Sequence, residues 1–557
     1  SIKNRMGQMK MKDKNIFFKI VKKSILFGGI AAAGTFPVLA QTNYYFTPES
    51  SGQTKFSSDT AWSYDEAGSQ RAIVPPSSWD SVYFVNNSGD KKTLELSSAE
   101  TTIKEFIVAG NSIGKAEVVF GNAALDNNAV FEIDGKIKGL IGTGLGNYFT
   151  MDGSFWTTTG QTTNVTVRAK GFELGVEGYG GGYQGTDTIH TVFTVAFGSR
   201  SIITHSEFII DGDVQLGGYG YKNQSETSLV LNVDRAVVNG VVKIQSDGMG
   251  WSNIKNSKDG MVFELGGLQL SDETHVDCGI YNNPNMGLTS TLVFKNAKGT
   301  DYKFRGNVSD FGYLSTPPAN TNSKLNIVMD GEGTQRIYTY RANDLAYSTQ
   351  SGTFTVNNGK FYLGNGLLRE ENRKASLVLN GGIFGAYNYS ETEQGFAYFK
   401  TATFKSGGIS VENTELFAAQ TPSLIVVTEK LSKDGAEKIK VDFTNANGAA
   451  FNPGDFGISL AEYGADYSEI DNWTEILVAA DLEGFSLNEI SEGIYDASGD
   501  FEGSGIENAM AVFRWVNDSA NGYSLQVGLT QVPEPSAVAA VFAAAVLAFV
   551  FARKRAK

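Results

Sequence analysis

Short runs in which apolar and polar residues alternate recur along most of the chain. Their period is two residues rather than 3.6, which predicts β-strands with one buried and one exposed face. We find no convincing amphipathic helix outside the two terminal segments. The chain is therefore predicted to be all-β. The clearest runs are residues 130–133, 208–210, 229–233, 241–244, 261–265, 292–294, 325–329 and 377–379.

Asn-Gly and Asp-Gly pairs lie at the ends of these runs and predict tight turns, because such pairs supply residues with positive φ. The turns could close antiparallel hairpins or form the corners of a parallel β-solenoid, and periodicity alone does not separate the two. The 64 glycines outnumber the 11 prolines, and no proline lies between Pro76 and Pro284, which suits extended β pairing. The pairs are Asp134-Gly135, Asp211-Gly212, Asn239-Gly240, Asp330-Gly331, Asn358-Gly359 and Asn380-Gly381.

One stretch favours the solenoid. Residues 351–366 read S-G-T-F-T-V-N-N-G-K-F-Y-L-G-N-G. This resembles the autotransporter-associated β-strand repeat, G-T-x-T-V-x-x-G-x-L-x-L-G, with Phe361 in place of the usual leucine. Residues 380–384 and 406–411 look like degenerate copies. That repeat builds right-handed parallel β-helices on secreted bacterial proteins, so the resemblance implies a right-handed parallel β-helix (β-solenoid) over residues 101–417.

The open ends of such a ladder would template aggregation, so we expect each end to be capped. Residues 41–100 carry a large aromatic load that includes Trp62 and Trp79, and we assign them to an N-terminal β cap. Pro422 breaks the pattern at the other end. Residues 418–530 are therefore predicted to form a small C-terminal β domain, either a β-sandwich or a cap.

The N-terminal forty residues have the features of a signal peptide. A basic region precedes the apolar segment 25–33, and Val38-Leu39-Ala40 resembles a cleavage site, so cleavage after Ala40 would leave Gln41 first. The chain opens on Ser1, and Met6, Met9 and Met11 are candidate start residues. The basic region consists of Lys10, Lys12, Lys14, Lys19, Lys22 and Lys23.

The C-terminal residues 532–557 predict a membrane-anchored tail. Val532-Pro533-Glu534-Pro535 leads into the apolar run 537–552, which is followed by the basic residues Arg553, Lys554, Arg555 and Lys557. Sixteen residues span about 24 Å as a helix, a little less than a hydrocarbon core of about 30 Å, and snorkelling basic side chains could supply the difference. By the positive-inside rule the basic end stays cytoplasmic and the preceding chain lies across the membrane.

This order of motif, single membrane helix and basic end resembles the PEP-CTERM sorting tail. The resemblance implies anchoring in the inner membrane of a Gram-negative bacterium and processing by an exosortase-type enzyme at the motif. It also implies delivery to the cell surface or to an exopolysaccharide matrix.

Charge and cysteine content exclude several classes of function. The formal net charge of the chain is −14; the leader 1–40 holds eight basic residues and one acid, and the tail ends in four basic residues, so residues 41–552 carry −25. That sign disfavours nucleic acid as a partner. Cys278 is the only cysteine, so no intramolecular disulfide forms.

Few residues suggest catalysis, and we expect no cofactor. There are three histidines, His190, His205 and His275, and a strand would place His275 and Asp277 on one face, where they could seed a metal site or an acid/base pair. Carbohydrate-active β-helices gather acidic and basic residues on adjacent turns. Asp211 and Asp213 could belong to such a patch, and so could Asp234 with Arg235.

The sequence therefore leads to two hypotheses. The first is a non-enzymatic, exosortase-sorted structural or adhesive protein of the cell surface or exopolysaccharide matrix, with exopolysaccharide or a host glycan as its partner. The alternative is a secreted β-helix enzyme that degrades polysaccharide as a lyase or glycoside hydrolase.

Overall fold

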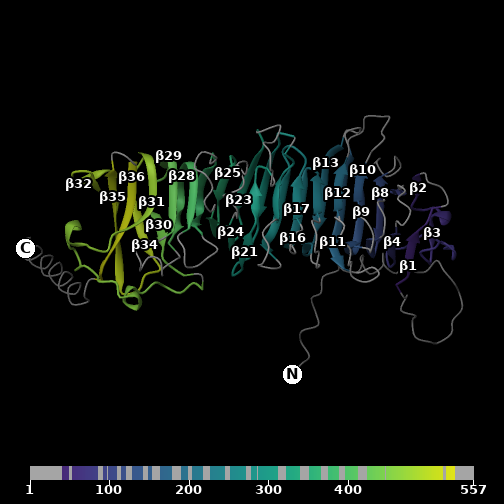
Figure 1. The fold of residues 1–557 in the computed structure, drawn as a ribbon, viewed down its shortest axis with the longest axis horizontal. Helices are drawn as coiled ribbons and strands as arrows, with labels where there is room; N and C mark the ends of the chain where they lie inside the picture. Colours follow the sequence, from purple (N-terminus) through teal and green to yellow (C-terminus); the bar gives the residue numbers. More distant parts are fainter. Residues whose placement is uncertain are drawn as a thin grey trace, which may run out of the picture. The chain divides into compact units, whose positions relative to one another are not determined.

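The described part of the chain consists of β-strands and loops (Figure 1). The computed structural model describes residues 41–48, 53–85, 92–96, 98–109, 115–120, 128–141, 148–153, 163–177, 190–197, 203–217, 226–244, 251–270, 278–284, 286–311, 322–338, 350–364, 374–387, 395–411, 423–445, 447–518 and 522–532. Within these ranges there is no α-helix, only the short 3-10 helices η1 (Asp59–Ala61), η4 (Pro453–Phe456) and η5 (Tyr467–Glu469). The prediction of an all-β protein is confirmed.

The strands form two sheets, and residues from Thr42 onward belong to one compact unit. The smaller sheet contains β2 (Gln53–Lys55), β5 (Lys92–Leu96), β8 (Lys115–Phe120), β10 (Tyr148–Gly153), β12 (His190–Phe197), β15 (Glu226–Asn232), β17 (Trp251–Asn256), β19 (Cys278–Asn282) and β22 (Asn307–Ser309).

The larger sheet contains the remaining strands. They are β1 (Asn43–Phe46), β3 (Trp62–Ser63), β4 (Ser81–Val85), β6 (Glu100–Ile103), β7 (Glu105–Ala109), β9 (Ala129–Ile141), β11 (Thr163–Glu177), β13 (Ile203–Ile210), β14 (Val214–Leu216), β16 (Arg235–Ile244), β18 (Val262–Leu270), β20 (Thr289–Phe294), β21 (Asp301–Arg305), β23 (Lys324–Met329), β24 (Thr334–Tyr338), β25 (Thr353–Val356), β26 (Lys360–Gly364), β27 (Ser376–Ala386), β28 (Phe396–Ser410), β29 (Leu424–Lys433), β30 (Ile439–Asp442), β31 (Thr474–Glu483), β32 (Asn488–Ser491), β33 (Ile494–Asp496), β34 (Phe501–Ser504), β35 (Ala509–Asp518) and β36 (Gly522–Gln531).

From β4 to β31 the strands of the larger sheet stack in parallel, each on the next segment of the chain. Long strands bend and pair twice: the first part of β11 pairs with β13, and its second part pairs with β14. Within the described part of the chain, the strands of the smaller sheet also pair in parallel, as β12 does with β15. These long parallel sheets are consistent with a β-solenoid.

The Asn-Gly and Asp-Gly pairs are corners or bends in this stack and not hairpin turns. Asp211-Gly212 separates β13 from β14, and Asn239-Gly240 lies within β16 at a register shift. The expected positive φ occurs at Gly359, where φ is 59°, but not at the other five pairs. At those corners glycine is required because the backbone of the preceding turn lies where a Cβ atom would be, as the Lys170 carbonyl does at Gly212.

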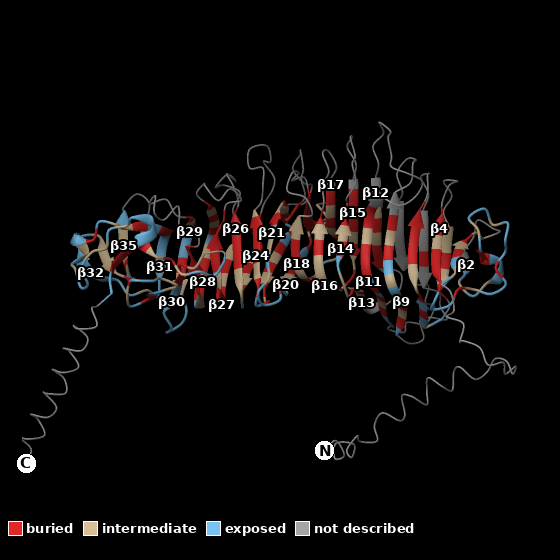
Figure 2. Cartoon of the chain, turned by 90° about the horizontal axis from the view of Figure 1, so that it is seen from below, coloured by how far each residue is buried: buried red, intermediate tan, exposed pale blue. Residues whose placement is uncertain are grey.

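Buried residues recur on successive strands along the whole stack (Figure 2), and parallel pairing aligns their apolar side chains into continuous inner columns. In-register pairs place equivalent residues of successive turns directly above one another. The first inner column runs Phe131, Val167, Phe208, Ala236, Phe263, Leu292, Ile327, Phe354, Leu377, Ala402 and Leu431. The second inner column runs Ile133, Ala169, Ile210, Val238, Leu265, Phe294, Met329, Val356, Leu379, Phe404 and Lys433.

Antiparallel strands meet the parallel stack at both ends. At the N-terminal end β1 pairs in parallel with β4 and antiparallel with β3. At the C-terminal end β31 pairs in parallel with β29 and antiparallel with β36, after which β35, β33 and β32 continue antiparallel. β32 lies at the end of this antiparallel series, and its four residues are all exposed. So short an edge strand offers little backbone for another chain to pair with.

Candidate functional site

Most of the residues of the predicted export signals lie outside the described part of the chain. Ala40, Pro533, Glu534, Pro535, Arg553, Lys554 and Arg555 all fall there, and so does the apolar run 537–552. Gln41 and Val532 border these segments, and both are exposed. Among the described residues, no helix has the length and apolar character needed to cross a membrane.

The histidines predicted as candidates do not gather into a site. His190 begins β12, while His275 and Asp277 lie outside the described residues. His205 lies on β13, where its Nε2 is 3.2 Å from Glu207 Oε1. The described residues contain no group of three or more histidine, cysteine, aspartate or glutamate side chains that could hold a metal ion.

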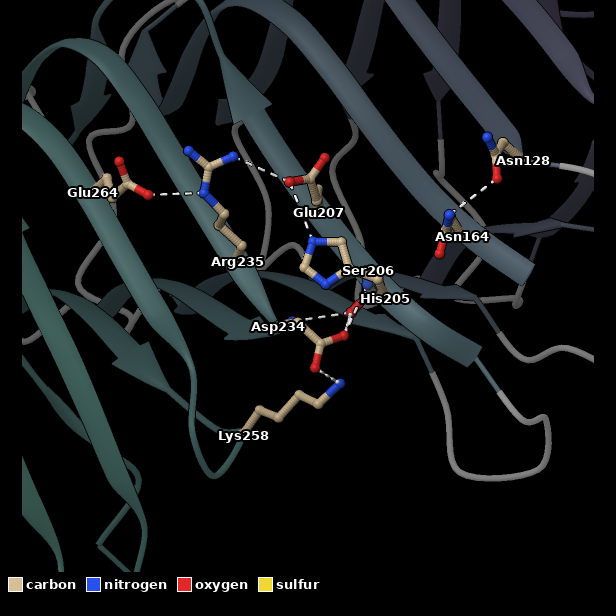
Figure 3. A network of polar contacts seen from close by, with 9 residues as sticks. All are labelled: Asn128, Asn164, His205, Ser206, Glu207, Asp234, Arg235, Lys258 and Glu264. Carbon is tan, nitrogen blue, oxygen red and sulfur yellow. Dashed lines mark hydrogen bonds and ion pairs between the residues drawn. The ribbon is translucent and has the colours of Figure 1, made fainter. Parts of the chain in front are cut away.

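Asp234 and Arg235 belong to a polar network on the outer face of three neighbouring turns (Figure 3). Arg235 links two strands: its Nε lies 2.8 Å from Glu264 Oε1 on β18, and its Nη1 lies 3.1 Å from Glu207 Oε1 on β13. Beside it, Asp234 Oδ1 lies 2.7 Å from Lys258 Nζ, and Asp234 Oδ2 accepts hydrogen bonds of 2.8 Å from both Ser206 N–H and Ser206 Oγ.

A second network surrounds the other predicted pair, Asp211 and Asp213. The Nε and Nη2 atoms of Arg168 each donate to one oxygen of Asp211 at 2.9 Å, a bidentate arrangement. Asp213 accepts from Lys243 Nζ at 2.7 Å and from the Val241 N–H at 2.9 Å. The sequence therefore located two real polar clusters, and the structure adds their cationic partners from the neighbouring turns.

The cationic partners keep these carboxylates ionised. The hydrogen bond from Arg168 lowers the pKa of Asp211. Burial is the largest single influence at Asp213 and Asp234 and opposes ionisation. The hydrogen bonds from Lys243 and Lys258, together with backbone hydrogen bonds and the lysine charges, outweigh it, so both pKa values lie below the usual range. A general acid in sugar hydrolysis needs the opposite, a carboxyl whose pKa is raised towards neutrality. These three aspartates are suited to holding neighbouring turns together.

The comparisons with known proteins name no relative. No protein-family model, no curated protein and no solved structure matches the chain. Any functional argument therefore rests on the residues and geometry of this chain.

Two charged pairs that each contain a buried side chain were not anticipated from the sequence. Arg336 on β24 is 3% exposed and pairs with Asp301, and Lys433 at the end of β29 pairs with Asp500. Lys433 can be recognised by its position in the second inner column, directly after Phe404. Finding it requires the register of the parallel strands, which the sequence pattern does not provide.

The lowered pKa of Asp211 predicts a loss of stability in acid. Because its folded pKa lies below the unfolded value of about 3.9, its pairing with Arg168 stabilises the fold above that value and is lost as pH falls through the folded pKa. We expect the urea midpoint to stay level from neutral pH down to about pH 4 and to fall below it. The Asp211→Asn variant should start lower and converge with wild type at the acid end. Parallel curves that never converge would contradict the assignment.

Proposed function

We propose that this protein is an exported, non-enzymatic structural or adhesive component of the cell surface or exopolysaccharide matrix. Its parallel strands would form a right-handed β-solenoid that acts as a spacer, with exopolysaccharide or a host glycan as partner. The single observation that carries this proposal is the continuous parallel stack from β4 to β31, in which Asp211, Asp213, Asp234 and Glu207 on the outer face pair with cations of adjacent turns. A surface of this kind favours rigidity over catalysis.

The proposed localisation of the protein rests on the two ends of the chain. The signal peptide 1–40 would direct export, and the tail 532–557 would hold the chain in the inner membrane until an exosortase-type enzyme processes it at Val532-Pro533-Glu534-Pro535. Exposure of Gln41 and Val532 at the borders of the described residues is compatible with access of processing enzymes to both sites.

The sorting proposal is tested by changing Pro533-Glu534-Pro535 to Ala-Ala-Ala. The variant should accumulate in the inner membrane while its β-sheet content, measured by circular dichroism, stays that of wild type. Replacement of the distant, exposed Glu437 by Ala serves as the control and should leave delivery unchanged. Surface or matrix delivery of the motif variant at wild-type levels would refute the sorting role.

A β-helix enzyme that degrades polysaccharide is the second candidate, favoured by the acidic and basic side chains that meet on adjacent turns around Asp211 and Asp234. The purified protein incubated with acidic and neutral polysaccharides distinguishes the two. New reducing ends or unsaturated sugar products that disappear in Asp211→Asn would favour the enzyme. Retention of the intact polymer on the protein without cleavage is the result expected from the structural proposal.

A further inference from the structure

The second inner column ends in a charged residue. Ten successive positions of this column are apolar, and the eleventh, opposite Phe404, is Lys433. The Lys433 side chain retains 9% of its accessible surface. An amine that continues an apolar column into the end of the stack is costly unless a partner compensates its charge.

The partner of Lys433 is Asp500, which precedes β34. Asp500 is 3% exposed, and its Oδ1 atom lies 3.1 Å from Lys433 Nζ. Its other oxygen, Oδ2, accepts a hydrogen bond of 2.6 Å from the Ser486 N–H. Lys433 Nζ also donates to the Gly435 carbonyl at 3.1 Å, which fixes the direction of the amine. Both reacting groups are thus oriented by backbone atoms.

The residues beside this pair form an aromatic cluster. Phe485 precedes Ser486, Phe501 follows Asp500, and their rings stack with centroids 5.9 Å apart. Both rings lie edge-on to Trp515, which is fully buried. The cluster adjoins both partners along the chain, and the Lys433 and Asp500 side chains keep only 9% and 4% of their accessible surface, so water has little access to the pair.

We propose that Lys433 and Asp500 condense to an intramolecular amide. A proton passes from the Lys433 ammonium to Asp500 Oδ1, and the free amine attacks Cγ. The Ser486 N–H stabilises the negative charge that develops on Oδ2. A second proton from Nζ reaches the Oδ1 hydroxyl, which leaves as water while the C=O bond reforms. The only product besides the amide is one water molecule, and no oxidant or co-reactant is needed.

Formation of the amide is favoured because the two groups are held close together and are shielded from water. The two groups are held at reaction distance by the fold, which replaces the entropy cost of an encounter. The amide would tie β29, near the C-terminal end of the parallel stack, to the segment that leads into β34, which itself pairs with β30. It would close the C-terminal end of the stack covalently in a chain that has no disulfide.

The chain contains a comparison pair of the same type. Lys360 Nζ lies 2.7 Å from Asp442 Oδ2, but the Lys360 side chain is 29% exposed. The remaining oxygen of Asp442 accepts from the N–H and hydroxyl of Thr444. Because water reaches this lysine, we expect the Lys360–Asp442 pair to stay ionic. The pair therefore serves as an internal control for burial.

The experiment is mass spectrometry of the purified full chain under denaturing conditions. Wild type should be lighter than its sequence by one water, and digestion should yield one branched peptide that contains Lys433 and Asp500. Lys433→Arg keeps the positive charge but cannot form the amide, and it should show the unmodified mass. Because the wild-type result stands alone, poor folding of that variant does not affect the test. A wild-type mass without water loss, with separate peptides carrying Lys433 and Asp500, would overturn the proposal, and so would a loss located at Lys360–Asp442.

Discussion

The Gly240→Ala variant is expected to lose about 2–3 kcal/mol of unfolding free energy, the cost typical of overpacking where the surroundings cannot yield. Gly240 lies inside β16 with no positive φ, so backbone strain is not the cause. A Cβ atom there would overlap the backbone carbonyl group of Gly212 in the turn before it. Gly266 in the next turn is equally close to the backbone of Gly240. The three glycines let three turns stack in direct backbone contact.

Two other glycines separate the cost of close packing from the cost of backbone strain. Gly499 has ordinary φ and no atom within 4 Å of an added Cβ, so Gly499→Ala should be neutral or slightly stabilising. Gly299 also has open space but a φ of 82°, so Gly299→Ala should cost about 1 kcal/mol from left-handed strain alone. Urea unfolding followed by far-ultraviolet circular dichroism measures the series.

Because long parallel stacks can open in parts, amide hydrogen exchange of β14, β16 and β18 should accompany the urea data. Loss of protection in Gly240→Ala should be greatest in those strands. A Gly240→Ala variant as stable as Gly499→Ala would show that the turns can move apart at little cost, and close stacking would then not explain the glycine.

The strands were predictable because alternation encodes which face is buried. The runs 208–210 and 325–329 lie within β13 and β23 as expected, and their odd and even positions face opposite sides. The corners were also located correctly at pairs such as Asp211-Gly212. Their physical cause was not, since the sequence suggested positive φ and the structure shows close approach of the preceding turn. That contact depends on a residue some forty positions away.

The charged clusters, too, could be predicted only in part from the sequence. Asp211 and Asp213 were identified from their spacing along one segment, but Arg168 and Lys243, which neutralise them, come from the turns before and after. Lys433 appears in the sequence as one charge among many. Only the register that places it after Phe404 reveals that it continues an apolar column. Parallel pairing brings residues that are distant in the sequence into contact. The alternation of apolar and polar residues does not show which residues pair.

The buried guanidinium of Arg336 predicts the second large effect. Its Nε and Nη2 atoms donate to both oxygens of Asp301 at 2.9–3.0 Å, and its Cζ lies 4.2 Å from the centre of the Tyr362 ring. Removing one member of a buried pair leaves the other charge without compensation. Since Asp301 retains 32% of its side-chain surface, we expect Asp301→Ala to cost about 2–4 kcal/mol, somewhat less than for a fully enclosed pair.

Two further variants identify desolvation as the cause. Arg336→Met removes the charge itself while keeping a long side chain against Tyr362, so it should cost less than Asp301→Ala. Asp330→Ala breaks the Lys295–Asp330 pair, in which the lysine left behind is 46% exposed, and should cost under about 1 kcal/mol. The urea midpoints of Asp301→Ala, Arg336→Met and the double variant form a double-mutant cycle for this pair. The midpoint of Asp330→Ala is measured beside them. If Asp301→Ala and Asp330→Ala cost the same, Arg336 is effectively solvated in the folded protein despite its burial. If Arg336→Met is the costliest of the three, its packing on the tyrosine ring outweighs its charge.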